Sequence, residues 1–285
     1  MKTYSVIIPA HNEANFLEGT LQSLCEQTVS ALEIILVNDN ATDDTETIMQ
    51  RFSAAHANIS YVNHESEAAH LPGAKVIHAF AFGLKHLEQP YDVLVKLDAD
   101  LLLPENYFET ILAHFKSDSK IGMAGGFAYI EKNGEWILEN LTDKDHIRGA
   151  FKAYRKECFL EIGNLKPAMG WDTVDELLCK FYGWEVVTDS SLKVKHLKPT
   201  GANYNKTARF KQGEAFYSIG YGFFITAIAS LKLAFLKGKP LLFFDYIQGF
   251  WKAKLNHKPL LVTDEQAKFI RNYRWKKMKG KIFNI

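Results

Sequence analysis

The stretch Val93-Leu94-Val95-Lys96-Leu97-Asp98-Ala99-Asp100 joins a nearly continuous apolar run to two carboxylates. A run of this kind is typical of a parallel strand that helices cover on both faces. Side chains two positions apart on an extended chain point to the same side, so Asp98 and Asp100 can face one point in space. Two close carboxylates repel unless a cation lies between them, and Mg²⁺ or Mn²⁺ suits that place. Taken alone the pair is weak support, because two acids can also simply cap the turn toward Pro104.

The first hundred residues alternate short β-branched runs with longer amphipathic patterns. The runs that predict strands are Ser5–Ile8, Glu33–Val37, Ile59–Val62 and Val93–Leu97. The patterns that predict helices are Leu17–Cys25, Asp43–Phe52 and Val76–Leu84. This alternation predicts right-handed crossovers and an open parallel sheet, which binds ligands at the carboxyl ends of its strands.

Two parts are expected along the chain. After residue 104 the pattern is mixed, and the predicted elements are the helices around Phe108–Phe115 and Asp172–Tyr182 and the strands Met123–Tyr129 and Leu192–His196. Beyond Gly201 the composition shifts to aromatic and basic residues. We therefore predict an α/β domain over residues 1–200 and a helical extension over residues 201–285.

Composition excludes several classes of protein. Hydrophobic residues make up 47% of the 285 residues and charged residues 24%, which is ordinary for a folded protein with a sizeable core. The three cysteines form no Cys-x-x-Cys motif, which argues against a disulfide framework or a zinc knot and fits a reducing compartment. We find neither a signal-peptide core nor an apolar run of the roughly 20 residues that a bilayer crossing needs. A cytoplasmic protein without a transmembrane helix is the expectation.

Charge is distributed unevenly along the chain. Residues 201–285 hold 16 basic and 4 acidic residues, whereas the first 200 hold 18 basic and 29 acidic residues. In the extension Lys residues are interleaved with Phe, Tyr and Trp, as in amphipathic helices that lie in a membrane interface. We predict peripheral attachment to an anionic membrane at its cytoplasmic face through residues 201–285. Alternatively, the aromatic side chains pack on the domain and only the Lys side chains face water. No motif for nucleic-acid recognition accompanies the charge, so nucleic acid is not expected as a partner.

Two further motifs stand at the ends of the first two predicted strands. They read Pro9-Ala10-His11-Asn12-Glu13 and Val37-Asn38-Asp39-Asn40-Ala41-Thr42-Asp43, and Asp98-Ala99-Asp100 follows them. The ordered set resembles glycosyltransferase family 2, which carries Pro-x-x-Asn-Glu, Val-Asp-Asp-Gly-Ser-x-Asp and Asp-x-Asp. The resemblance covers roughly residues 4–200 and implies the GT-A fold, a Rossmann-like, mostly parallel sheet with helices on both faces. Asn38, Asn40 and Ala41 depart from the family's Asp, Gly and Ser, which leaves the nucleotide base open.

The resemblance implies a site for a nucleotide-diphospho-sugar in residues 1–104. Asp39 would accept a hydrogen bond from the base, which suits uracil and favours a UDP-sugar, and Lys75 would contact phosphate. The resemblance also places Asp100 as a direct ligand of Mn²⁺ or Mg²⁺, with Asp98 nearer the ribose and metal-bound water. His196 would complete the metal shell. The implied donor-binding residues are Pro9, Ala10, His11, Glu13, Asp39, Gly73, Lys75 and Asp98.

The resemblance places the catalytic base and the acceptor side in residues 105–200. Gly170-Trp171-Asp172-Thr173-Val174-Asp175-Glu176 precedes Gly183-Trp184, and this resembles the family's Glu-Asp pair opening a helix that ends in Gly-Trp. Counting back from Gly183 sets Trp171-Asp172 over that pair, so Asp172 is the implied general base and Asp175 the second candidate. The family's Glu is Trp171 here, and an Asp at a helix start is often just an N-cap. Gly125-Gly126 and Arg148-Gly149 stand where related enzymes form the acceptor side.

These residues together imply an inverting, metal-assisted glycosyltransferase. The acceptor would be a saccharide or a lipid-linked saccharide in the assembly of cell-surface polysaccharide or lipopolysaccharide. An alternative of another class is a non-catalytic protein of the same fold that only binds nucleotide sugars, since fold alone does not set activity. A sugar nucleotidyltransferase is less favoured, because Pro9–Glu13 contains no glycine for a phosphate loop after the first strand.

Overall fold

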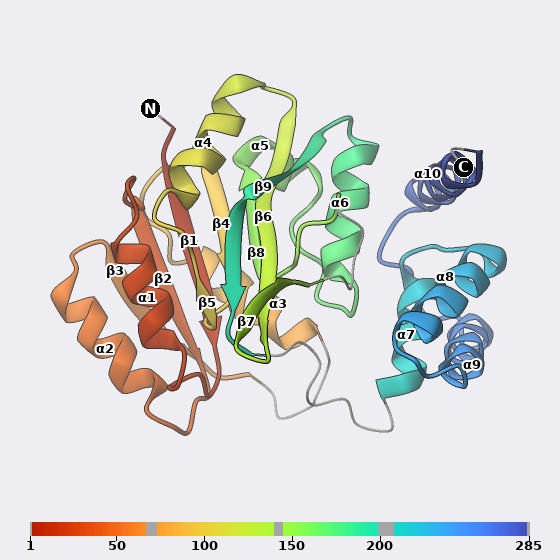
Figure 1. Cartoon of the computed structure of the whole chain (residues 1–285), viewed down its shortest axis with the longest axis horizontal. Coiled ribbons are helices and arrows are strands. Elements are labelled where there is room, and N and C mark those ends of the chain that lie inside the picture. Colours follow the sequence, from red (N-terminus) through yellow and green to blue (C-terminus); the bar gives the residue numbers. More distant parts are fainter. Residues whose placement is uncertain (1, 67–72, 140–144, 199–207, 284–285) are drawn as a thin grey trace.

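A computed structural model describes residues 2–66, 73–139, 145–198 and 208–283 of the chain. Its centre is a nine-stranded sheet in the order β3-β2-β1-β4-β8-β6-β9-β5, with β7 paired to β6 (Figure 1). The strands are β1 Tyr4–Ala10, β2 Glu33–Asp39, β3 Ile59–His64, β4 Val93–Leu97, β5 Leu101–Leu102, β6 Ile121–Lys132, β7 Glu135–Leu138, β8 Phe151–Arg155 and β9 Glu185–His196. The helices of this α/β part are α1 Leu17–Cys25, α2 Thr45–Ala55, α3 Ala74–Leu84, α4 Tyr107–Ser117, α5 Lys156–Glu161 and α6 Trp171–Phe181.

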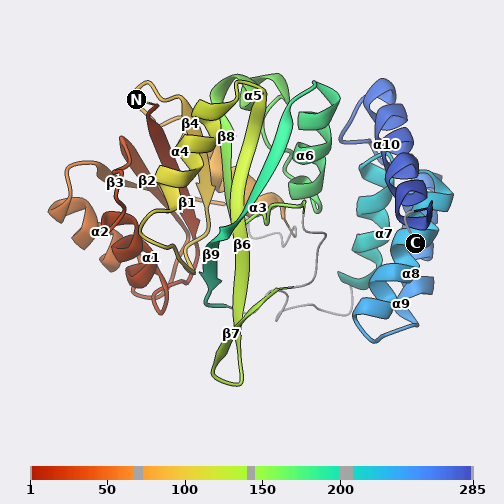
Figure 2. The same ribbon diagram turned by 45° about the horizontal axis from the view of Figure 1, so that its top comes forward.

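The half of the sheet built from β3, β2, β1 and β4 is parallel, as predicted. All residues of β1 and β4 are buried, which explains their nearly continuous apolar sequences. Helices α1, α2 and α4 lie on one face of the sheet and α3, α5 and α6 on the other (Figure 2). Because these strands are parallel, their carboxyl ends meet at one edge, and Ala10, Asp39 and Asp98 come together there.

The other half of the sheet, built mostly from residues after 104, contains both antiparallel and parallel pairs. Strand β8 pairs antiparallel with both β4 and β6, and β9 then runs parallel to β6. The sequence reading missed β8 because Phe151–Arg155 contains two basic residues, yet all five residues are buried. Lys152 and Arg155 are tolerated there because Lys152 bonds to Asp175 of α6 and Arg155 donates to backbone carbonyl oxygens of α4 and β6.

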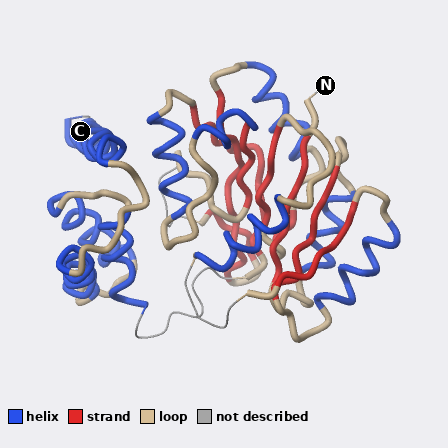
Figure 3. Tube along the Cα trace, turned by 180° about the vertical axis from the view of Figure 1, so that it is seen from behind, coloured by secondary structure: helices blue, strands red, loops and turns tan. Residues whose placement is uncertain are grey.

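Helices α7 Ala208–Ser218, α8 Phe223–Leu236, α9 Leu242–Leu255 and α10 Asp264–Phe283 form the predicted helical extension. They stand together beside α6, on the side of the sheet away from β3 (Figure 3). Phe181 of α6 meets Phe269 of α10 with ring centroids 5.4 Å apart, and both helices share the main hydrophobic core. The predicted boundary near residue 200 lies outside the described residues. Among the described helices, none is long and apolar enough to cross a bilayer.

Two glycines set the distance between α7 and α9. A Cβ on Gly213 would lie 1.8 Å from the Tyr246 carbonyl oxygen, and a Cβ on Gly249 would lie 2.0 Å from the Phe210 carbonyl oxygen. These atoms belong to the backbone of the facing helix, so no side-chain rotation can relieve the clash. The two helices therefore cross at a separation that only glycine permits.

Gly249→Ala should lower the free energy of unfolding by about 1–3 kcal/mol, because the added methyl group overpacks this crossing. Urea denaturation measures the change. Gly280→Ala in α10 is the matched control, since its Cβ meets no described atom within 4 Å and alanine raises helix stability by up to about 1 kcal/mol. A stability of Gly249→Ala equal to that of the wild type would contradict the close crossing.

Candidate active site

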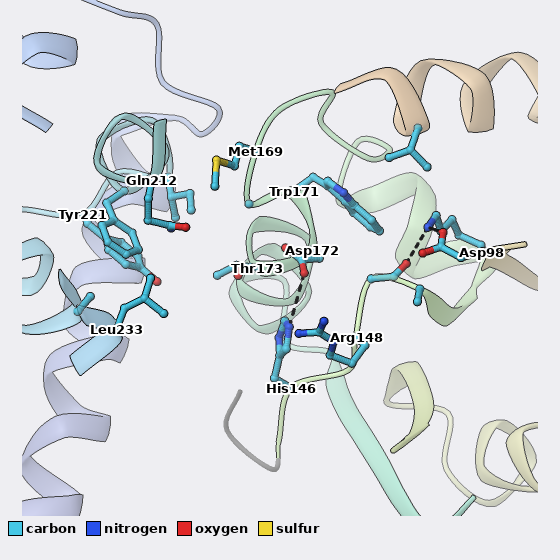
Figure 4. Close-up of a pocket in the computed structure, with 18 of the residues that line it drawn as sticks. Asp98, His146, Arg148, Met169, Trp171, Asp172, Thr173, Gln212, Tyr221 and Leu233 are labelled. Carbon is cyan, nitrogen blue, oxygen red and sulfur yellow. Dashed lines mark hydrogen bonds and ion pairs between the residues drawn. The ribbon is translucent and has the colours of Figure 1, made fainter. Parts of the chain in front are cut away.

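A cavity of about 1270 Å³ opens between the carboxyl ends of the parallel strands and the helical extension. Its walls come from β1, β2 and β4, from the start of α6, and from α7, α8 and α10. Figure 4 shows Asp98 at one side of this cavity, Tyr221 and Leu233 at the other, and Asp172 between them. The cavity therefore joins the two parts that the sequence separates.

Most of the residues implied for donor binding line this cavity. Those present in its wall are Pro9, Ala10, His11, Glu13, Asp39, Lys75 and Asp98. Gly73 is not in the wall; it caps α3 with φ of 76°, in the left-handed region that favours glycine. A Cβ there would lie 2.9 Å from the Ala168 carbonyl oxygen, so Gly73 brings the start of α3 against the segment before α6.

Histidines hold the polar end of β2 in place. His64 Nδ1 lies 3.0 Å from Asp39 Oδ1, and His11 Nδ1 lies 2.6 Å from the Asp39 carbonyl oxygen. Asp39 is 6% exposed, which leaves a fixed, nearly buried carboxylate at the cavity wall. This arrangement suits recognition of a single donor group such as the N–H of a nucleotide base.

Asp98 and Asp100 have different partners. Asp98 is ion-paired with Lys96, whose ammonium group also donates to the Gly149 carbonyl oxygen at 3.0 Å. Burial raises the pKa of Asp98, with Lys96 opposing and Asp100 adding to that rise. Asp100 Oδ2 lies 3.3 Å from His196 Nε2, at the last residue of β9. Sequence reasoning missed Lys96, which supplies a positive charge next to the carboxylate pair.

Asp100 and His196 offer two donor atoms of the kinds that Mn²⁺ accepts. His196 Nδ1 is buried and finds no hydrogen-bond partner among the described residues. No group of three or more His, Cys, Asp or Glu in the described part of the chain is arranged to hold a metal ion by itself. The donor set therefore fits a cation that takes its remaining ligands from a diphosphate and water, as Mg²⁺ and Mn²⁺ do in sites that also bind phosphates.

Asp172 projects into the cavity from the first turn of α6. Its Oδ2 lies 3.7 Å from His146 Nε2, and His146 Nδ1 lies 3.0 Å from Glu176 Oε2 one turn along the helix. Burial works to raise the pKa of Asp172, but His146, Lys152 and Arg148 outweigh it and lower that pKa to about 2. Burial works to lower the pKa of His146, but its two carboxylate partners raise it to about 9. Asp172 is thus held as a carboxylate beside an imidazolium.

Asp175, the second candidate for the base, lies in a buried network away from the cavity. Lys152 Nζ is 2.8 Å from Asp175 Oδ1 and 3.3 Å from Glu176 Oε1, and it donates to the Asp172 carbonyl oxygen at 2.5 Å. The Tyr154 hydroxyl donates to Asp175 Oδ2 at 2.6 Å. Burial raises the pKa of Asp175, with Lys152 opposing. These contacts fix α6 on β8 and thereby place Asp172.

Several cavity residues escaped the sequence reading. Trp171 replaces the family's Glu, and its ring lies 5.3 Å from Lys96 Nζ and 5.7 Å from Lys152 Nζ, two buried lysines on neighbouring strands. The other unpredicted residues of the wall include His146, Tyr221, Lys232, Arg274 and Lys277. His146 carried no signal, because its partners Asp172 and Glu176 are distant in sequence. Arg148 and Gly149, which the resemblance set on the acceptor side, line the cavity.

The family is settled by comparison with known proteins. A family model described as Glycosyl transferase family 2 matches residues 5–167, more than half of the chain. The chain belongs to glycosyl transferase family 2. This confirms the family that the sequence motifs implied, and the site residues described above lie both within and beyond the matched segment.

Curated relatives match about half of this chain. Glycosyltransferase GlyA of Streptococcus pneumoniae is 30% identical over 142 residues, which are 49% of this chain and 19% of GlyA. Minor teichoic acid biosynthesis protein GgaB of Bacillus subtilis is 31% identical over 143 residues, 48% of this chain and 15% of GgaB. The match to this chain therefore spans less than a fifth of the length of either relative.

The solved structure of a mannosyltransferase, PcManGT from Pyrobaculum calidifontis in complex with GDP-Man and Mn²⁺, has the same fold. The TM-score is 0.59 at 15% sequence identity, and the match covers 94% of this chain and 78% of that chain. At this identity the likeness shows the fold alone, and it confirms the predicted GT-A class.

The ion pair of His146 makes the stability of the protein depend on pH. Because the pKa of His146 is raised from 6.5 to about 9 by folding, its stabilising effect is complete below pH 6.5 and is lost as the pH rises through 9. Between pH 6.5 and 9.5 the wild type should lose about 1–3 kcal/mol more than His146→Gln in urea denaturation. His78→Gln, at an exposed histidine of α3, should keep the wild-type dependence. Equal losses in wild type and His146→Gln would rule out the pairing.

Proposed function

We propose that the protein transfers a sugar from a nucleotide-diphospho-sugar to an acceptor hydroxyl with inversion of the anomeric carbon. The observation that carries this proposal is the position of Asp172 in the cavity, between the Asp98–Asp100 end and the helical extension. A donor seated against Asp39 and Asp100 would present its anomeric carbon toward the middle of the cavity. An acceptor that comes from the side of the extension would then meet Asp172.

In this proposal Asp172 is the general base. The acceptor hydroxyl oxygen attacks the anomeric carbon, its proton passes to the Asp172 carboxylate, and the bond to the diphosphate oxygen breaks. Attack opposite the leaving diphosphate inverts the configuration, and no protein nucleophile is needed. His146 keeps Asp172 ionised and oriented, so the carboxylate is ready before the substrates bind.

The proposed metal ligands are Asp100 and His196, with Asp98 beside them. A bound Mn²⁺ or Mg²⁺ supplies positive charge that stabilises the departing diphosphate. Lys96 adds to the positive charge at this end of the cavity, and Trp171 shields it from water. We favour a UDP-sugar because the single fixed carboxylate of Asp39 suits the N–H of uracil. Assembly of cell-surface polysaccharide is the proposed setting, in line with the printed name of GgaB.

Asp172→Asn should reduce the rate of nucleotide release from the preferred donor about 10²–10⁴-fold, the usual contribution of a general base. The assay measures release of UDP or GDP from a panel of nucleotide sugars with Mn²⁺. Thermal shift with UDP and Mn²⁺ should show unchanged donor binding, since Asn preserves the shape of the side chain. Asp175→Asn is the comparison: near-normal turnover of Asp172→Asn with loss in Asp175→Asn would transfer the role to Asp175.

We also propose that the extension binds an anionic membrane surface. On α8, Phe224, Ile228, Leu231 and Phe235 recur with helical spacing on one face, and Phe224 and Phe235 are 71% and 84% exposed. Leu241, Phe244 and Leu255 add exposed apolar surface on and beside α9. Residues 223–258 contain six Lys and a single acidic residue, Asp245. An apolar stripe flanked by Lys is the pattern of helices that lie in a membrane interface.

The double variant Phe224→Ser/Phe235→Ser should co-sediment at least about fivefold less than wild type with vesicles of phosphatidylserine and phosphatidylcholine, because it removes two exposed aromatic side chains that would insert into the bilayer. Leu160→Ser is the matched control, since Leu160 is 61% exposed but lies on α5 of the α/β part. Failure of the wild-type protein to bind these vesicles at low salt would sink the membrane proposal.

A further inference from the structure

A second, smaller pocket of about 150 Å³ adjoins the cavity beside the proposed base. Four basic side chains line it, Lys180 of α6, Lys232 of α8 and Arg274 and Lys277 of α10. His146, whose pKa is raised to about 9 by Asp172 and Glu176 despite its burial, adds a fifth positive charge. The opposing acids among the described lining residues are Asp145, which is ion-paired with Lys277, and Glu176, which pairs with His146. The surplus of positive charge marks this pocket as a place for an anion.

The pocket and the cavity share walls. Both are lined by His146, Thr173, Lys232, Arg274 and Lys277, so an anion held in the small pocket borders the space that contains Asp172. This anion would lie on the acceptor side, because Asp98 lies across the cavity from Tyr221 and Leu233 (Figure 4). The diphosphate of the donor is therefore a different group, seated at the Asp100–His196 end.

Arg274 is the side chain best placed to hold such an anion. Its guanidinium carbon lies 5.4 Å from the centre of the Tyr221 ring, which fixes the plane of the group. Its Nε is buried and finds no hydrogen-bond partner among the described residues. A buried N–H without a partner is costly unless a ligand accepts its hydrogen bond, and a guanidinium suits phosphate oxygens in particular.

The cavity wall next to these basic groups is apolar. It includes Ile225, Ile228, Leu233 and Leu236 of α8 and Met278 of α10. Ile228 and Leu236 are also 46% and 49% exposed, so this wall continues onto the outer apolar surface of α8. A hydrocarbon chain lying along α8 could thus begin at the basic pocket and end in the membrane interface.

We propose that the acceptor is a saccharide joined through a phosphate or diphosphate to a hydrocarbon chain. The basic pocket of Lys180, Lys232, Arg274 and Lys277 binds the phosphate, the apolar wall of α8 binds the start of the chain, and the saccharide reaches Asp172. The inference rests on the proposed function, because it names the acceptor class of that same site. The inference requires that a single ligand place a negative charge in the basic pocket and apolar surface against the wall of α8.

The test uses the full chain in EDTA, so that a donor-site metal does not contribute, with farnesyl diphosphate as the probe. Isothermal titration calorimetry compares it with farnesol, which lacks the phosphates, and with inorganic diphosphate, which lacks the chain. Farnesyl diphosphate should bind at least about tenfold more tightly than farnesol or inorganic diphosphate, because its diphosphate contacts the basic pocket and its chain contacts the apolar wall. If inorganic diphosphate binds as tightly as farnesyl diphosphate, the apolar wall does not bind the chain. If farnesol binds as tightly, the basic pocket does not bind the phosphate. Either result would overturn the inference.

Variants locate the binding on the molecule. Arg274→Gln and, separately, Lys277→Gln should weaken farnesyl diphosphate binding about tenfold, and Arg274→Lys should retain part of it. The double variant Lys252→Gln/Lys254→Gln removes two exposed charges of α9 outside the cavity and should bind like wild type. An equal loss in this control would move the site to the outer surface and overturn the inference.

The donor reaction separates this inference from the function on which it rests. Arg274→Gln should still bind UDP with Mn²⁺ like wild type in thermal shift, which also shows that the variant is folded. If the protein releases nucleotide from a donor but does not bind farnesyl diphosphate selectively, the proposed transferase function is supported and this acceptor class is rejected. Absence of nucleotide release from every donor in the panel would instead reject the proposed function.

Discussion

The buried ammonium group of Lys152 holds the catalytic end of the molecule together. It lies on β8, in the middle of the sheet, and it bonds to Asp175, Glu176 and the carbonyl oxygen of Asp172. A buried charge of this kind is stable only while all its partners are in place. The first turn of α6 is therefore fixed to the sheet at three points. This attachment places the backbone of Asp172 at the cavity, and the contact with His146 then orients its carboxylate.

The same network divides three nearby carboxylates into different roles. Asp175 is enclosed with Lys152 and Tyr154, Glu176 bonds to the backbone N–H of Ile147 at 2.8 Å, and Asp172 alone of the three lines the main cavity. His146 connects Glu176 to Asp172 and so couples the buried network to the cavity. A helix start with three acids would repel itself without these cations. The cations also explain how Trp171 can stand where the family has Glu, since Lys96 and Lys152 lie within 6 Å of its ring.

Sequence reasoning reached the parallel half of the fold and the polar residues that follow its strands. Apolar strands such as Val93–Leu97 and the polar residues that follow them carry a local signal, and the structure brings Asp39, Asp98 and Asp100 to one edge as that signal predicts. Strand β8 was missed because Lys152 and Arg155 interrupt its pattern, and only tertiary partners explain their burial. His146 and Arg274 were missed for a related reason. Each acquires its role from residues far away in sequence, which no local pattern encodes.

The charge pattern of the basic, aromatic extension predicts a role at the surface. In the structure, helices of the extension also form one wall of the cavity. The match to the family ends at residue 167, whereas α7–α10 occupy residues 208–283. The proposed base Asp172 and metal ligand His196 lie past the end of that match but before α7, so the proposed chemistry and the far wall belong to different segments of the chain. On the acceptor proposed for this wall, a change confined to the last helices would redirect the enzyme to another substrate while the bond-forming machinery stayed the same. On the proposed function, the reacting groups and the acceptor-binding wall can therefore change independently of each other in evolution.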